Sequence, residues 1–97
     1  MTQKVTLLCK GQPGMGPVLL DGFQATLADT RAHEGCVSVE VYVDADDLDT
    51  VFLIEEWDSR SHYERYMSWR IETGLIELLE SVLLSPLELR YLEPRLL

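Results

Sequence analysis

The alternation of apolar and polar residues predicts four β-strands along this chain of 97 residues. Apolar and polar positions alternate over residues 4–10, 36–44 and 87–91, which is typical of strands that bury one face. In the second of these stretches one face is expected to carry all four valines: Val37, Val39, Val41 and Val43. Residues 51–54 are apolar at every position, which predicts a strand that has both faces covered and begins at Thr50 or the next residue.

Between the predicted strands, apolar residues recur at helical spacing in two stretches. The first begins at Pro17, which suits the first position of a helix, and ends before Gly35, an expected left-handed cap. Gly22, inside this stretch, is expected to allow close packing on the sheet. The second stretch follows residues 58–59, whose side chains can cap a helix, and it is interrupted at Gly74.

The order of these elements, β-α-β-β-α-β, predicts a single domain over residues 1–97 with the ferredoxin-like α+β fold. This fold places the helices on one face of an antiparallel sheet. The other face is expected to carry side chains that are too apolar for water: Leu8, Tyr42, Phe52 and Ile54. A second copy of the same sheet is the natural cover, so we expect a symmetric homodimer formed through this sheet face.

The charge of the chain limits its partners. The formal net charge is −9, from 17 acidic and 8 basic side chains. Such a surface repels phosphate groups, so we expect neither a nucleic-acid partner nor an anionic membrane.

No run approaches the roughly 18 apolar residues of a membrane span, and the first residues lack the layout of a signal peptide. We therefore expect a cytoplasmic protein.

The residues that most often bind metals or phosphates do not have the required spacing. Cys9 and Cys36 are expected to be free, packed thiols, because neither belongs to a C-x-x-C pair and their strands are not neighbours in this fold. The glycine-rich segment 11–16 lacks the Lys-Ser/Thr of a phosphate-binding loop. The acidic segment 44–49 lacks the glycine and the distal glutamate of a calcium loop. We expect a turn, a solvated hairpin and no bound metal.

Two motifs carry a resemblance to a known family. Residues 33–41 read H-E-G-C-V-S-V-E-V and residues 55–63 read E-E-W-D-S-R-S-H-Y. In this order and at this spacing they resemble the antibiotic biosynthesis monooxygenase (ABM) family, over residues 4–91 of the chain. The resemblance implies a dimeric α+β barrel, which agrees with the homodimer expected from the apolar strand faces.

The resemblance implies several possible activities. Members of the family include haem-degrading enzymes, an isomerase of a signalling sugar, and oxygenases that oxidise quinols or anthrones without metal or flavin. Haem-degrading members use an asparagine, a tryptophan and a histidine, whose places fall at Leu7, Tyr66 and Ile76 in this chain. Without the axial imidazole haem loses its anchor, so we expect no cofactor.

The polyketide-oxidising members resemble this chain better. Their tryptophan and tyrosine fall at Trp57 and Tyr63. Their asparagine is replaced by Leu53, and the histidine that many members carry is replaced by Tyr66. Fewer polar groups are then left to hold a substrate oxyanion.

We therefore predict a small, cofactor-independent monooxygenase that acts on an aromatic quinol or polyketide-type substrate in a pocket between helices and sheet. The predicted catalytic residues are Glu55, Trp57 and Tyr63. Glu55 is expected to be a partly buried base with a raised pKa. The predicted substrate-binding residues are Leu7, Leu53, His62, Tyr66 and Arg70.

Other interpretations remain open from the sequence. The alternative function is a non-catalytic dimeric domain that binds or senses a small aromatic molecule, and a purely structural domain with a filled core is a third. Strand parity turns Glu55 inward, but a β-bulge before the helix would exchange it with Glu56. Trp57 and Tyr63 can also be residues of the wall and core. His62 is also compatible with an exposed helical position, and Arg70 with a surface or interface ion pair.

Overall fold

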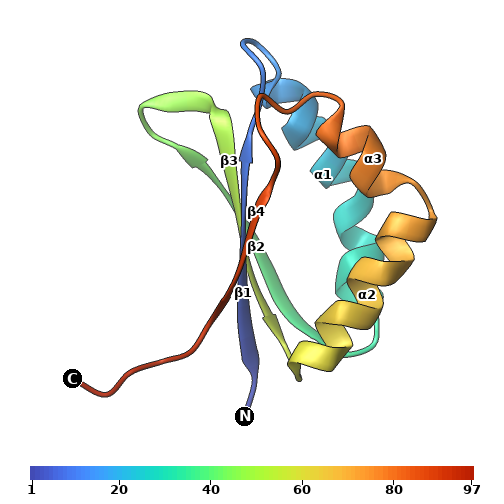
Figure 1. Ribbon diagram of the computed structural model, residues 1–97, viewed down its shortest axis with the longest axis vertical. Coiled ribbons are helices and arrows are strands. Elements are labelled where there is room, and N and C mark those ends of the chain that lie inside the picture. Colours follow the sequence, from blue (N-terminus) through green and yellow to red (C-terminus); the bar gives the residue numbers. More distant parts are fainter.

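A twisted sheet of four strands carries all the helices on one of its faces in the computed structural model, which describes residues 1–97 (Figure 1). The strands are β1 Gln3–Lys10, β2 Cys36–Asp44, β3 Asp47–Trp57 and β4 Glu88–Leu92. The helices are α1 Gly16–Ala32, α2 Arg60–Glu72 and α3 Leu75–Glu80. No helix covers the other face of the sheet (Figure 1).

The strands lie side by side in the order β2-β3-β1-β4, and every neighbouring pair is antiparallel. This is the ferredoxin-like α+β arrangement predicted from the order of elements. Because β3 lies between β1 and β2, Cys9 and Cys36 are on strands that do not pair, and both thiols are free. The expectation of free cysteines is thus confirmed.

The hairpin between β2 and β3 is tighter than predicted. Asp44 pairs with Asp47, so β3 begins three positions before the expected Thr50. Asp46 and Asp47 are exposed, as expected, whereas Asp49 is half-buried and has a structural role. Its carboxylate accepts hydrogen bonds from the backbone N–H groups of Gly14 at 3.0 Å and Gly16 at 2.8 Å. The acidic segment therefore holds the glycine-rich segment in place at the start of α1.

One valine of β2 departs from the predicted face. The pairing with β3 shifts between Cys36 and Ser38, which leaves Val37 as the extra residue of a β-bulge. Val37 is 51% exposed, whereas Val39 is buried in the core. A bulge changes the parity of one strand locally, and alternation alone does not reveal it. Since this bulge lies in β2, the parity of β3 is undisturbed from Val51 to Trp57.

The ends of the helices agree with the expected caps. The Ser59 side chain accepts a hydrogen bond from the backbone N–H of His62 and so caps α2. Gly35 and Gly74 have positive φ angles of 90° and 85°, a conformation that glycine adopts at little cost. Gly74 separates α2 from α3, at the predicted interruption.

Two groups of buried side chains lie between the sheet and the helices. The larger group is aliphatic and consists of Leu7, Cys9, Leu19, Val39, Val51, Leu53 and Leu83. The smaller group is mainly aromatic and consists of Val5, Trp57, Tyr63 and Tyr66. Full burial of one large apolar side chain contributes about 1.5–3 kcal/mol, so the aromatic group is a major support of this end of the molecule. None of the helices is long and apolar enough to cross a membrane.

Candidate functional site

A cavity of about 230 Å³ lies between the sheet and the helices. Its wall is largely hydrocarbon and includes Leu7, Leu19, Phe23, Leu27, Leu53 and Leu79. The exposed side chains of Val18 and Leu78 also line it, which places them at its rim. An apolar cavity with a few polar groups is the usual form of a small-molecule site.

Gly22 of α1 helps to keep this cavity open. A Cβ atom at this position would meet nothing within 4 Å, and the residue lines the cavity. The expectation that Gly22 allows close packing on the sheet is therefore wrong. The missing side chain leaves space for a ligand instead.

Glu55 brings a carboxyl group to the cavity wall. It lies on β3, is 2% exposed and faces the helices. Glu56 points to the other face, where its carboxylate lies 3.6 Å from the Lys4 ammonium. Strand parity thus places the two glutamates as expected, because no bulge interrupts β3 between Val51 and Trp57.

The surroundings of Glu55 raise its pKa into the neutral pH range. Burial raises its pKa from the ordinary 4.5 to about 7, because a charged carboxylate is poorly solvated in an apolar setting. The indole Nε1–H of Trp57 donates a hydrogen bond of 3.0 Å to Glu55 Oε1, which opposes part of this rise. A carboxyl group with this pKa can both take up and release a proton near pH 7.

Trp57 and Tyr63 lie behind the cavity wall and do not line it. Both side chains are completely buried, with their ring centroids 5.6 Å apart in an edge-to-face arrangement. The Tyr63 hydroxyl is enclosed and has no hydrogen-bond partner. Burial, followed by the nearby charge of Glu55, raises the pKa of Tyr63 far above its ordinary value. In this conformation neither residue touches a ligand in the cavity, and Trp57 acts on the site through Glu55.

A second polar group lies in the cavity wall around Arg70. This residue of α2 is only 5% exposed and forms none of the ion pairs of the chain. Its Nε–H donates to the Tyr66 hydroxyl at 2.9 Å, and its Nη2–H groups donate to the Thr30 hydroxyl and the Thr26 carbonyl oxygen, each at 2.9 Å. The interpretation of Arg70 as a surface ion-pair residue is therefore wrong.

The hydroxyls of Tyr66 and Thr30 complete this group. Their oxygens lie 2.8 Å apart, and Thr30 Oγ1 also lies 3.4 Å from the Thr26 carbonyl oxygen. Since Arg70 can only donate, the Tyr66 hydroxyl can donate to Thr30 Oγ1, and the Thr30 hydroxyl can donate to the Thr26 carbonyl oxygen. In this arrangement the Tyr66 O–H donates its hydrogen bond within the protein and not to a ligand.

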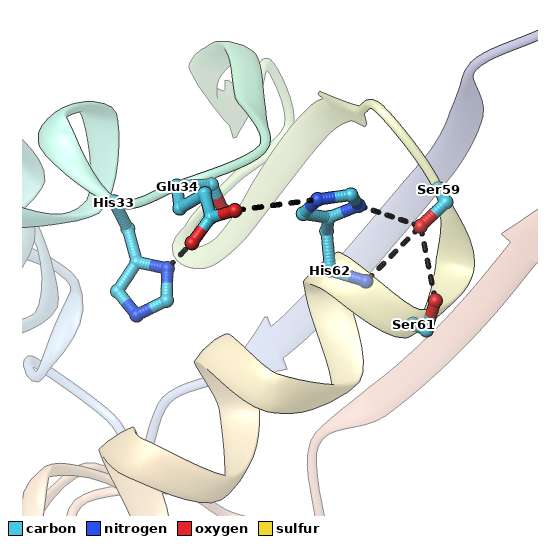
Figure 2. Close-up of polar contacts among 5 residues, drawn as sticks. All are labelled: His33, Glu34, Ser59, Ser61 and His62. Atoms are coloured by element: carbon cyan, nitrogen blue, oxygen red, sulfur yellow. Dashed lines mark hydrogen bonds and ion pairs between the residues drawn. The ribbon is translucent and has the colours of Figure 1, made fainter.

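His62 lies outside the cavity, in the first turn of α2. Figure 2 shows its ring between the Ser59 hydroxyl and the Glu34 carboxylate. His62 Nδ1 is 2.7 Å from Ser59 Oγ, and His62 Nε2 is 4.0 Å from Glu34 Oε1. The ring also packs against Gly35, where a Cβ atom would come within 2.5 Å of it. His62 therefore joins the start of α2 to the α1–β2 connection, away from the predicted substrate.

Of the eight residues predicted for the site, five line the cavity: Leu7, Leu53, Glu55, Tyr66 and Arg70. The prediction missed Thr26 and Thr30, which line the cavity and fix the Arg70 guanidinium. Their spacing of four residues on α1 places them on one helix face, which was an available signal. The sequence did not indicate that Arg70, 40 residues later than Thr30, would reach this face.

Metal and haem ligands do not gather at this site. No three His, Cys, Asp or Glu side chains lie together in a way that could hold a metal ion. Ile76, at the place of the axial histidine in the haem-degrading relatives, contributes a hydrocarbon side chain to the cavity wall. The thiol of Cys9 also lines the cavity, and burial raises its pKa to about 11, so it stays protonated at neutral pH.

The fold and the cavity define a small α+β protein with an apolar site between helices and sheet. The family model described as antibiotic biosynthesis monooxygenase matches residues 5–69. The chain therefore belongs to the ABM family, as the two sequence motifs predicted. None of the curated proteins matches this sequence.

Several solved structures share the fold at low sequence identity. A conserved protein from Methanosarcina mazei Go1 superposes with a TM-score of 0.87 at 16% identity, covering 98% of this chain and 94% of its own. A protein described as an antibiotic biosynthesis monooxygenase gives 0.85 at 19% identity, covering 96% and 98%. A Mycobacterium tuberculosis protein gives 0.78 at 23% identity, covering 98% and 96%. At these identities the likeness concerns the fold.

Proposed function

We propose that this ABM-family protein is a cofactor-independent monooxygenase that acts on an aromatic quinol or polyketide-type compound in the cavity. The observation that carries this proposal is the carboxyl group of Glu55 in the cavity wall, with its pKa raised by burial to about 7. A base with this proton affinity suits the removal of a proton from a weakly acidic hydroxyl or ring CH₂ group near neutral pH. The family match supports the reaction class.

The proposed reaction uses dioxygen as the oxidant. For an anthrone, Glu55 removes a proton from the ring CH₂ group, and the resulting electron-rich anion transfers an electron to dioxygen. The two radicals combine to form a C–O bond, and protonated Glu55 returns its proton to the peroxide. Loss of water, with the second hydrogen of the ring carbon, leaves a carbonyl group. One oxygen atom thus enters the product and the other leaves as water.

The cavity supports this reaction in two ways. Its hydrocarbon wall excludes water from the anion and from the radical pair, which limits side reactions. The Trp57 N–H holds Glu55 Oε1 at 3.0 Å, so the other carboxylate oxygen remains for the substrate. Trp57 and Tyr63 are positioning residues in this proposal, because they pack behind Glu55 and do not line the cavity.

Oxygen uptake by the purified protein tests the proposal, with hydroquinones and anthrones as substrates and a chelator present. Saturable uptake is expected in the native chain. In Glu55→Gln, which keeps the shape but not the base, kcat should fall by about 100-fold or more. Glu56→Gln is the matched control, because Glu56 lies next to Glu55 in sequence but on the other face. Trp57→Phe removes the indole N–H and should lower kcat less.

The absence of uptake above the uncatalysed rate would favour the alternative function, a non-catalytic domain that binds a small aromatic molecule. One observation supports this alternative. The Tyr63 hydroxyl lies outside the cavity, and the Tyr66 hydroxyl is held by Arg70 and Thr30. Leu53 occupies the place of the asparagine in the polyketide-oxidising relatives, so few groups remain to hold an oxyanion. Stabilisation of the inactive protein by the same compounds would then identify a binding module.

We propose further that the protein works as a homodimer through the open face of its sheet. Leu8, Phe52 and Ile54 are only half-buried there in the single chain, and Tyr42 is 49% exposed. Apolar side chains gathered on one sheet face are typical of an interface. The dimer encloses this face, while the cavity lies on the opposite side of the sheet, under the helices.

A further inference from the structure

Arg70 places a positive charge in the wall of an apolar cavity with no negative partner. Its side chain is nearly inaccessible, and no carboxylate lies within 4.0 Å of it. All three of its hydrogen bonds are to neutral oxygens, those of Tyr66, Thr30 and Thr26. Burial of a charge without a counter-charge is unfavourable, so this arrangement favours a ligand that supplies the missing negative charge.

The guanidinium group has one free edge. The three hydrogen bonds of Arg70 use Nε and Nη2, and Nη1 has no partner in the protein. Nη1 is not enclosed, because the Tyr63 hydroxyl is the only enclosed side-chain N or O atom without a partner. Arg70 is only 5% exposed and lines the cavity, which favours access to these N–H groups from the cavity.

The fixed contacts prepare this edge for a ligand. Thr26 and Thr30 hold Nη2 from α1, and Tyr66 holds Nε from one turn earlier on α2. The guanidinium carbon also lies 4.5 Å from the centroid of the Trp69 ring. A side chain that is already ordered loses little entropy when a ligand binds, which increases affinity.

The cavity therefore has two separate polar positions. Glu55 and Arg70 both line it but form no ion pair with each other. The carboxyl group of Glu55 suits a neutral hydroxyl or acidic C–H group. The Nη1 edge of Arg70 suits a group that is already anionic, because guanidinium binds carboxylates through charge-assisted hydrogen bonds.

We infer that the ligand of this cavity is an aromatic acid, whose carboxylate binds the free Nη1 edge of Arg70 while its ring occupies the apolar part of the cavity. The inference rests on the proposed function in one respect: it takes the cavity as the ligand site. It does not depend on oxygen chemistry. The net charge of −9 works against the approach of an anion, so a preference for acids has to come from a local contact.

Calorimetric titration with naphthylacetate and naphthylacetamide tests this inference. The two probes share a ring system and differ in charge. The acid is expected to bind the native chain at least about tenfold more tightly than the amide, as for a charge-assisted hydrogen bond. Arg70→Gln should remove this preference and leave the affinity for the amide within about twofold.

Arg31→Gln is the matched control. Arg31 is also an arginine that donates to a backbone oxygen, that of Val39 at 3.0 Å, but it does not line the cavity. This variant should keep the full preference for the acid. Arg70→Lys keeps the charge and should retain part of the preference. Circular dichroism confirms that each variant is folded, and the native chain alone already decides whether the acid is preferred.

Equal affinity of the native chain for both probes, or binding of neither, would overturn the inference. The same holds if Arg70→Gln still prefers the acid. These results are distinguishable from a failure of the proposed function. Oxygen uptake without a preference for acids would support the proposed monooxygenase and contradict the inference that the ligand is an aromatic acid. A preference for acids without oxygen uptake would support the inference and favour the binding module.

Discussion

The two faces of β3 differ in every property that matters for function, although their residues alternate along one strand. On the helix-covered face, Leu53, Glu55 and Trp57 are almost completely buried. On the open face, Phe52 and Ile54 are half-buried, and Glu56 pairs with Lys4. Burial on the covered face raises the pKa of the Glu55 carboxyl group. The open face instead presents apolar side chains to the solvent. One strand thus serves a site and a proposed interface at the same time.

The covered face is itself divided between packing and open space. Around Trp57 and Tyr63 the aromatic rings fill the interior completely. Further along, the cavity remains open where Gly22 contributes no side chain. Glu55 lies at the boundary, since it bonds to Trp57 and also lines the cavity. This position explains how a carboxyl group can be both strongly desolvated and accessible to a ligand.

The largest effect is expected from a charge on the open face. Phe52→Asp places a carboxylate in the proposed dimer interface, where it has no partner. We expect the dissociation constant of the dimer to rise by at least about 1,000-fold, which corresponds to about 4 kcal/mol. Size-exclusion chromatography with light scattering should show the mass of the native chain falling from two copies to one.

Ile71→Asp is the control for this experiment. Ile71 is 59% exposed on α2, away from the sheet, so this variant should remain a dimer. A native chain that is monomeric at micromolar concentration, or a dimeric Phe52→Asp variant, would contradict the proposed interface.

The next effect concerns Glu55 and the pH dependence of stability. Its pKa is about 7 in the folded chain against an ordinary 4.5, so the folded state binds the proton more tightly than the unfolded state. Stability is therefore lost as the pH rises from about 4.5 to about 7, and the loss stays constant above that range. Its size is about 3 kcal/mol, because each pKa unit corresponds to about 1.4 kcal/mol.

Glu55→Gln removes this dependence and can still accept the Trp57 hydrogen bond. Urea unfolding at one protein concentration should show the variant about 3 kcal/mol more stable than the native chain at about pH 8, and nearly equal to it at about pH 4.5. Glu56→Gln, on the open face, should show no such difference between the two pH values. A pH-independent effect of Glu55→Gln would mean that the carboxyl group is not desolvated.

The smallest effect is expected at Gly22. Gly22→Ala adds a methyl group to α1 at a position where a Cβ atom meets nothing within 4 Å. The variant should be about 0.5–1 kcal/mol more stable in urea unfolding, because alanine favours a helix over glycine. The methyl group also takes up room in the cavity, so affinity for a large aromatic ligand should fall. A loss of stability would instead indicate close packing at this position.

Much of the fold was predictable because its signals are local. The alternation in β1 and β2, the apolar run in β3, the Ser59 cap and the interruption at Gly74 each depend on a few neighbouring residues. Their order then restricts the topology to very few arrangements. The errors also had local causes. The early start of β3 follows from the short turn after Asp44, and the exposure of Val37 follows from a bulge.

The candidate site was predictable only in part. The inward position of Glu55 follows from strand parity, and the aromatic residues of α2 follow from helical spacing. The cavity itself was not predictable in its extent, because it depends on how two helices and a sheet pack around Gly22. Trp57 and Tyr63 were predicted as catalytic residues with core packing as the alternative, and they lie in the aromatic core behind the cavity wall.

The sequence by itself determined the order of the elements, the two faces of β3 and the family to which the chain belongs, since these follow from short-range patterns. Only the tertiary structure decided the environment of the two charged groups in the cavity. The pKa of Glu55 is raised to about 7 because the helices exclude water from its carboxyl group. Arg70 became a buried cation because Thr26 and Thr30, 44 and 40 residues away, fold against it. Solvation and long-range contacts set proton affinity and charge balance, and both exist only once the chain is folded.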